Sequence, residues 1–244
     1  MTSPRTEFRA GVKATIPLVI GAFPFGVIFG ALAITSGISI PGTMALSLFV
    51  FAGSAQFIAV GLVAQGISIP IVILTTLVVN LRHALYSATL APHVKHLRQR
   101  WLLPLGFLLT DEAFVVASTR YNEPGDVTHK HWYFLGSELL LFVCWLIFTW
   151  IGIFAGTLIP DPSRFGLDFA MSVTFIGMLV PLIKNRPVLA AVIVASVVAV
   201  LTYTMPNKIG LILAALAGVA AGVFFEARMQ PDLTPELEPE EAIP

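Results

Sequence analysis

Residues 14–34 read ATIPLVIGAFPFGVIFGALAI, a run of 21 residues without a charged side chain. A helix of this length rises about 30 Å, the thickness of the hydrocarbon core of a bilayer, so the run can form one membrane span. Basic residues between positions 5 and 13 precede it, as in a secretory signal peptide. The run is longer than the apolar part of a signal peptide, contains Pro17 and Pro24, and is followed by further apolar segments. We therefore interpret it as a retained span.

The composition of the whole chain extends this interpretation. Of its 244 residues, 57% are hydrophobic and 11% are charged, whereas about a quarter of the residues of a soluble domain are charged. The 14 Lys and Arg residues balance the 14 Asp and Glu residues, and no basic run is dense enough to indicate nucleic acid binding. Cys144 is the only cysteine, which excludes a disulfide framework and a cysteine-based metal site. We expect no cofactor.

Seven further apolar segments follow the first along the chain. With it, the candidate spans are residues 12–35, 42–66, 69–91, 102–119, 132–158, 168–183, 187–205 and 208–226. The segment 168–183 is short, and 69–91 contains polar residues, so either is a candidate for a broken helix. The sequence predicts an all-α integral membrane protein with seven or eight transmembrane helices, some of them broken, in a single transporter domain at 1–226. The tail, 227–244, is rich in Pro and Glu and is predicted to be disordered.

Lys and Arg residues in the loops indicate the orientation of the chain. If all eight segments cross and the N-terminus is cytoplasmic, eight basic residues lie inside and five outside. A topology in which one of the first three segments does not cross gives the same count. The positive-inside rule therefore favours a cytoplasmic N-terminus and leaves seven and eight crossings open.

A weak internal similarity predicts a repeat of about 125 residues. Residues 26–30 (GVIFG) are similar to 152–156 (GIFAG), and 45–47 (ALS) to 170–172 (AMS). The corresponding halves are 12–120 and 132–226, parallel with four crossings each or inverted with three. Chance similarity between glycine-rich helices is the alternative, and Gly-x-x-x-Gly pairs also allow close helix packing without any role in transport.

Three polar clusters interrupt the apolar segments, and the first is Gly53-Ser54-Ala55-Gln56-Phe57. Small residues at this place allow the helix to open and to offer backbone groups, Ser54 and Gln56 to a bound solute. The alternative for Gln56 is a hydrogen bond between helices, worth about 1 kcal/mol.

The second cluster is Asn80-Leu81-Arg82-His83. An arginine within a span costs at least about 2.5 kcal/mol, so Arg82 requires a partner, a cavity or an interface. The functional interpretation is that Arg82 meets a carboxylate of the substrate or of an acidic side chain, and snorkelling to the headgroups is the alternative. His83 is a candidate proton carrier because histidine titrates near physiological pH.

The third cluster is Thr110-Asp111-Glu112, near the centre of 102–119. Adjacent helical residues point about 100° apart, so at least one carboxyl group must face the interior of the bundle, protonated, paired or hydrated. A proton-coupled carrier uses such a group, and a loop position is the alternative. Glu138 lies near the start of its segment, where an interfacial position is equally consistent with the sequence.

These motifs resemble a known family. Residues 51–57 (FAGSAQF), 80–88 (NLRHALYSA) and 110–112 (TDE) are similar to the AzlC family, the large subunit of bacterial branched-chain amino acid exporters. The resemblance implies export of aliphatic amino acids, driven by the proton gradient or the membrane potential. It also implies the bacterial inner membrane as location and a small hydrophobic AzlD-like subunit as partner.

An aliphatic amino acid requires a receiver for its carboxylate, a receiver for its ammonium group and an apolar pocket. Arg82 or a helix N-terminus can supply the first, and Asp111 or Glu112 the second. The predicted substrate-binding residues are Gln56, Asn80, Arg82, Ser54 and Asp111, and the predicted proton-coupling residues are His83, Asp111 and Glu112.

Three other functions are consistent with parts of the sequence. An intramembrane hydrolase would use Ser54 as nucleophile and His83 as base. A structural subunit would leave the transport site to its partner. A channel would require a ring of repeated polar residues, which is not visible. We expect a transporter and not an enzyme.

Overall fold

The computed structural model of the protein describes residues 3–124, 129–158, 176, 180, 183–205 and 209–229. Each secondary-structure element in these ranges is a helix. The all-α prediction is therefore confirmed for this part of the chain. The chain divides into two compact units, Met1–Phe175 and Ile176–Pro244, which are described separately below.

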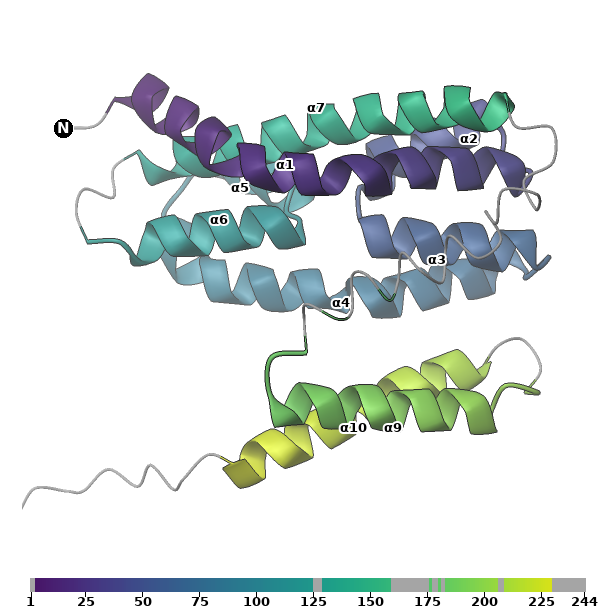
Figure 1. Cartoon of the computed structure of the whole chain (residues 1–244). Coiled ribbons are helices and arrows are strands. Elements are labelled where there is room, and N and C mark those ends of the chain that lie inside the picture. The colour runs from purple at the N-terminus through teal and green to yellow at the C-terminus, as the bar shows by residue number, and fades with distance from the viewer. Residues whose placement is uncertain are drawn as a thin grey trace, which may run out of the picture. The chain divides into compact units, whose positions relative to one another are not determined.

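Three long helices frame the first unit: α1 (Pro4–Thr35), α4 (Ile69–Val94) and α7 (Lys130–Thr157). Each is long and apolar enough to cross a membrane. Helix α1 continues through Pro17 and Pro24 without a break. Figure 1 shows α1 and α7 side by side and running in the same direction, whereas α4 runs the opposite way.

Glycines allow α1 and α7 to touch along their backbones. A Cβ atom placed on Gly152 would lie only 2.9 Å from the Cα atom of Gly30, and one placed on Gly26 would lie 2.6 Å from the Cβ atom of Phe148. Nearer the N-terminal ends of the two helices, Thr15 Oγ1 of α1 donates a hydrogen bond to Ser137 Oγ of α7 at 2.7 Å. Small residues thus provide the close helix packing expected of Gly-x-x-x-Gly pairs in lipid.

Two predicted spans are pairs of short helices. Residues 40–64 form α2 (Ile40–Ala45), which continues as the π-helical turn η1 (Leu46–Val50), and then α3 (Gly53–Ala64) after a break. Residues 99–122 form α5 (Gln99–Phe107) and α6 (Asp111–Asn122), again with a break between them. Helices α3 and α6 have 12 residues each, or about 18 Å, which is too short to cross a bilayer.

Each pair of short helices returns to the end of the unit from which it starts (Figure 1). Helix α2 begins just after α1 ends, and α3 leads through residues 65–68 to the start of α4. Helix α5 begins beyond the end of α4, and α6 returns to the same place, where Tyr121 stacks on His93 at a ring distance of 5.0 Å. The pairs are therefore re-entrant from opposite ends.

The two breaks meet beside the middle of α7. The ring of Phe51, at the first break, lies 4.9 Å from the ring of Phe142. Phe107, next to the second break, lies 6.4 Å from the same ring. Phe51 has a φ of 41°, a left-handed conformation that is unusual for a bulky residue and that ends the π-helical turn abruptly.

One end of the first unit carries eight of its nine described Lys and Arg residues, and we call it the basic end. The guanidinium of Arg120, near the end of α6, binds Glu7 of α1 at 2.6 Å. The ring of Trp101 in α5 contacts that of Trp132 in α7 at 4.7 Å. These contacts gather the starts of α1, α5 and α7 with the ends of α4 and α6. At or toward this end lie Arg5, Arg9, Lys13, Lys95, Arg98, Arg100, Arg120 and Lys130. Two described loops of the opposite end, residues 36–39 and 65–68, contain no Lys or Arg.

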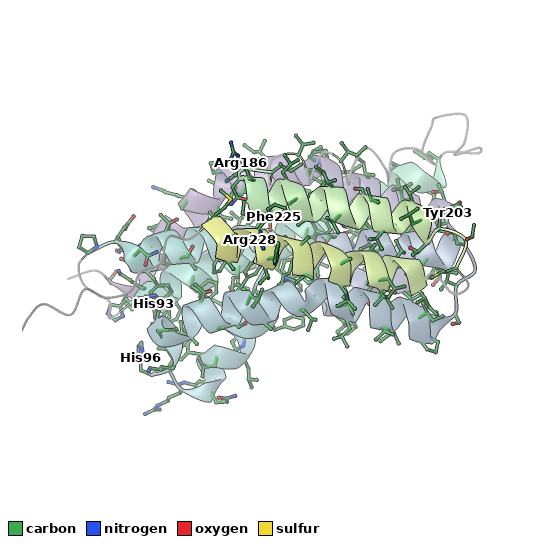
Figure 2. All side chains as sticks on the ribbon, turned by 90° about the horizontal axis from the view of Figure 1, so that it is seen from below. His93, His96, Arg186, Tyr203, Phe225 and Arg228 are labelled. Atoms are coloured by element: carbon green, nitrogen blue, oxygen red, sulfur yellow. The ribbon has the colours of Figure 1, made fainter. Side chains whose placement is uncertain are left out.

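The second unit contains a hairpin of α9 (Arg186–Leu201) and α10 (Ile209–Met229). The helices are antiparallel, because Gly210 packs near Thr202 and Gly218 near Ala195. Figure 2 shows Arg186 and Arg228 at one end of the hairpin and Tyr203 at the other.

The structure tests several predictions about the fold. Broken helices are confirmed, and the breaks lie in the segments 42–66 and 102–119. The prediction of a possible break in 69–91 is wrong, because α4 is continuous across this segment. Seven or eight crossings are not confirmed, since four helices of the described ranges, α1, α4, α7 and α10, are long and apolar enough to cross. Most of 168–183, residues 170–172 and the tail from 230 lie outside the described residues. The repeat, its two halves and the single domain at 1–226 stay predictions.

Candidate functional site

Two helix N-termini lie at the breaks. Helix α3 begins at Gly53 without a hydrogen bond from a capping side chain, so the first backbone N–H groups of α3 lack helical partners and carry partial positive charge. Helix α6 begins at Asp111, and the Thr110 side chain accepts a hydrogen bond from Ala113 N–H at 3.3 Å. Asp111 and Glu112 occupy the first turn of α6, where carboxylates are stabilised by the helix dipole.

Arg82 of α4 forms an ion pair with Asp111. Its Nη1 atom lies 3.1 Å from Oδ2 of Asp111, and both side chains are half-buried. Helices α3 and α4 form an antiparallel pair in which Leu62 and Val72 share an apolar cluster. Leu62 and Val72 lie at the same height in this antiparallel pair. Gly53 is nine residues before Leu62 and Leu81 is nine residues after Val72, so Gly53 and Leu81 also lie at one height. The ion pair is thus at the height of both helix N-termini.

The predicted substrate-binding residues share one property. Among the residues that the structure describes, each has a buried polar atom without a hydrogen-bond partner: Ser54 Oγ, Gln56 Oε1, Asn80 Oδ1, Arg82 Nε and Asp111 Oδ1. Buried polar atoms are normally paired, so such atoms near a break in two helices are available to a polar solute. The indole Nε1 of Trp145 has the same property, and its ring would contact a Cβ placed on Gly53 at 3.3 Å.

Comparison with known proteins decides the family. Residues 17–159 of the chain match the family described as AzlC protein. The chain belongs to the AzlC family. The resemblance seen in the motifs at 51–57, 80–88 and 110–112 is therefore confirmed.

Three AzlC relatives illustrate the extent of the similarity. A membrane protein of Archaeoglobus fulgidus is 36% identical over 219 residues, covering 88% of this chain and 94% of the relative. Inner membrane protein YgaZ of Escherichia coli is 28% identical, covering 88% and 87%. Branched-chain amino acid transport protein AzlC of Bacillus subtilis is 29% identical, covering 69% and 65%. No solved structure matches the chain. With the apolar helices, these relatives show that this AzlC protein is a membrane protein.

Gln56 belongs to a buried hydroxyl network. Its Nε2 atom donates to Ser47 Oγ at 3.0 Å, and Ser47 Oγ lies 2.8 Å from Thr149 Oγ1 of α7. All three side chains are fully buried. The interhelical hydrogen bond that was the alternative role of Gln56 is therefore present, and only its Oε1 atom is unpaired in the described structure.

The remaining predicted residues lie near the ion pair. The His83 Nδ1 atom is 3.3 Å from the carbonyl oxygen of Asn80, and the His83 ring meets that of Tyr86 edge-on at 5.8 Å. Tyr86 stacks on Phe114 of α6 at 4.4 Å, which ties α4 to α6 beside Asp111. Glu112 follows Asp111 and is partly buried. A hydrolase would require Ser54 to bond a base, but Ser54 Oγ has no partner among the described residues.

The face of α7 toward the breaks contains Glu138 and three residues that the sequence did not single out. Glu138, Phe142, Trp145 and Thr149 follow one another at helical spacing. Glu138 is fully buried within the protein, and its interfacial depth in the membrane stays an alternative. In the sequence, Phe142 and Trp145 look like ordinary apolar residues of a span. Only the helical spacing of the polar residues Glu138 and Thr149 on either side of them could have indicated that they face the breaks.

Proposed function

We propose that this AzlC protein exports branched-chain, aliphatic amino acids and that the substrate binds where the two helix breaks meet. The B. subtilis relative is named a branched-chain amino acid transport protein. The observation that supports a substrate site in this chain is the ion pair of Arg82 and Asp111 between the N-termini of α3 and α6. Broken helices of this kind bind substrates and ions at the middle of the membrane in other transporters.

The site offers a receiver for each end of an amino acid. The uncapped N-terminus of α3 and the Arg82 guanidinium would bind the carboxylate, and Asp111 would bind the ammonium group. Phe51, Phe142 and Trp145 would surround the aliphatic side chain. Binding would then exchange the ion pair for two pairs with the substrate, which keeps both charges compensated.

The basic end of the first unit would face the cytoplasm. Eight of the nine described basic residues between positions 3 and 158 belong to this end, and the ninth is Arg82. The positive-inside rule then places the N-terminus in the cytoplasm. In the second unit, Arg186 and Arg228 mark the cytoplasmic end of the hairpin by the same rule (Figure 2).

Export against a concentration gradient requires an energy source. We propose the proton gradient or the membrane potential, with His83, Asp111 and Glu112 as proton-coupling residues, since all three lie at or beside the ion pair. A small hydrophobic AzlD-like subunit is the proposed partner.

Reconstitution into liposomes tests the proposal. The purified chain, alone and with an AzlD-like subunit, would be loaded with unlabelled leucine and assayed for uptake of labelled leucine at equal pH and with an imposed pH gradient. We expect leucine counterflow in at least one preparation and faster flux with the gradient. Absence of leucine flux in each preparation would contradict the amino acid assignment.

A further inference from the structure

Glu138 of α7 is a buried carboxyl group for which the proposed site has no use. The side chain has no exposed surface, and both of its oxygen atoms lack a hydrogen-bond partner in the described structure. Glu138 lies one helical turn from Phe142, where the two breaks meet, on the side of the basic end. A carboxyl group in this place lies between the proposed substrate site and the cytoplasm.

Apolar residues of the second re-entrant pair cover Glu138. On α7, Phe134 and Leu141 flank it at four and three residues, and both pack in one apolar cluster with α5 and α6. Of the three α6 residues in that cluster, Ala113 and Ala117 have small side chains without exposed surface, and Tyr121 is the third. The α5–α6 pair therefore packs beside Glu138, and a movement of this pair would open a path for water to it.

Among the residues that the structure describes, the charged and titratable groups around Glu138 offer it no counterion. From α6, Tyr121 is within electrostatic reach, and Arg120 is bound to Glu7 of α1 and to Glu123. Lys13 of α1 and Arg100 of α5 are exposed. The ammonium group of Lys130 donates to the backbone oxygens of Tyr121 and Glu123, and His93 of α4 stacks on Tyr121.

An ionised carboxylate without a counterion or hydrogen bond is strongly disfavoured in such surroundings, so Glu138 must be protonated in this conformation. We propose that Glu138 is a proton-binding site of the transport cycle. It holds a proton while the α5–α6 pair covers it and releases that proton toward the basic end when the pair moves and water enters. This inference rests on the proposed function, and it adds a proton-binding residue outside the Arg82 cluster to the proton-coupling residues proposed above.

Infrared spectroscopy tests protonation independently of transport. The difference spectrum between the natural protein and Glu138→Gln, in lipid at neutral pH, should contain the carbonyl band of a protonated carboxyl group. If Glu138→Gln does not fold, the same spectrum is taken with Glu138→Leu, which also lacks the carboxyl group. Absence of the band would show that Glu138 is ionised and would overturn the inference, whether or not leucine is the substrate.

Flux measurements test coupling. Glutamine has the shape of protonated glutamic acid, so Glu138→Gln should keep leucine counterflow at equal pH and lose the stimulation by a pH gradient. Glu138→Asp should keep both. The matched control is Glu123→Gln at the basic end, which should keep both. Full stimulation in Glu138→Gln would overturn the inference, whereas a natural protein without counterflow would contradict the proposed function instead.

Discussion

Arg82 Nη1 lies 3.1 Å from Asp111 Oδ2, and this contact joins a continuous helix to the first residue of a half-length helix. Because Asp111 starts α6 and Arg82 lies in α4, the ion pair fixes the tip of the α5–α6 pair against a helix long and apolar enough to cross a membrane. A substrate with both charges would compete for each partner. In the proposed function, the same contact would serve stability without substrate and recognition with it.

The ion pair can be separated into these two roles by a double-mutant cycle. Arg82→Gln and Asp111→Asn should each lower thermal stability, because each leaves the other charge without its partner, whereas the double variant should recover part of the loss. The pair is half-buried, so we expect a coupling free energy of about 1 kcal/mol. Unfolding temperatures in detergent measure it, and additive losses would show that the two side chains do not interact.

Contact between α1 and α7 predicts different tolerance at two glycines of one helix. Gly30→Leu would insert a side chain between the backbones of α1 and α7, while Gly21 has open space around its Cβ position. Overpacking of this kind costs about 1–3 kcal/mol or more. Gly30→Leu should reduce the yield and the unfolding temperature, and Gly21→Leu should leave them near the values of the natural protein. Equal behaviour of the two variants would contradict the packing.

The buried hydroxyl network predicts a stability effect for Gln56. Gln56→Ala removes the donor to Ser47 and leaves a small cavity, so the free energy of unfolding should fall by about 1–3 kcal/mol. Ser47→Ala removes the acceptor, and the double variant should lose less than the sum of the single variants. Leucine counterflow of Gln56→Ala then shows whether Oε1 also binds substrate. A Gln56→Ala protein as stable as the natural one would contradict the network.

Re-entrant pairs predict the accessibility of introduced cysteines. In a Cys144→Ala background, Ile38→Cys and Gln65→Cys should react with a membrane-impermeant reagent from one and the same side of the membrane. His96→Cys and Asn122→Cys should both react from the other side. If residues 42–66 and 102–119 crossed the membrane, the members of each pair would react from opposite sides, which would contradict the fold.

Sequence patterns predicted the apolar helices but not the return of the two pairs. Segments 42–66 and 102–119 have the length and apolarity of a span. The second break contains apolar residues such as Leu108 and Leu109, so the sequence does not show where the helix ends. Flanking charge was the signal available. Basic residues flank 102–119 on both sides and neither side of 42–66, whereas a crossing segment normally has them on one side.

The residues of the proposed site were chosen from the sequence, whereas their arrangement could not be. Arg82 needed a partner because of its cost in a membrane, and Asp111 supplies it. Asp111 and Glu112 start a helix and do not lie in the middle of one, because Thr110 caps α6 after the break. Glu138 could not be ranked from sequence, since its burial depends on the contact between α7 and the α5–α6 pair.

The most direct test of the proposed site compares two arginines of the same chain. Labelled leucine counterflow would be measured in liposomes that contain Arg82→Gln, with Arg98→Gln at the basic end as matched control, each with and without an AzlD-like subunit. We predict that Arg82→Gln abolishes counterflow at normal protein levels and that Arg98→Gln retains it. Full counterflow by Arg82→Gln in the presence of the subunit would place the substrate site elsewhere and contradict the account.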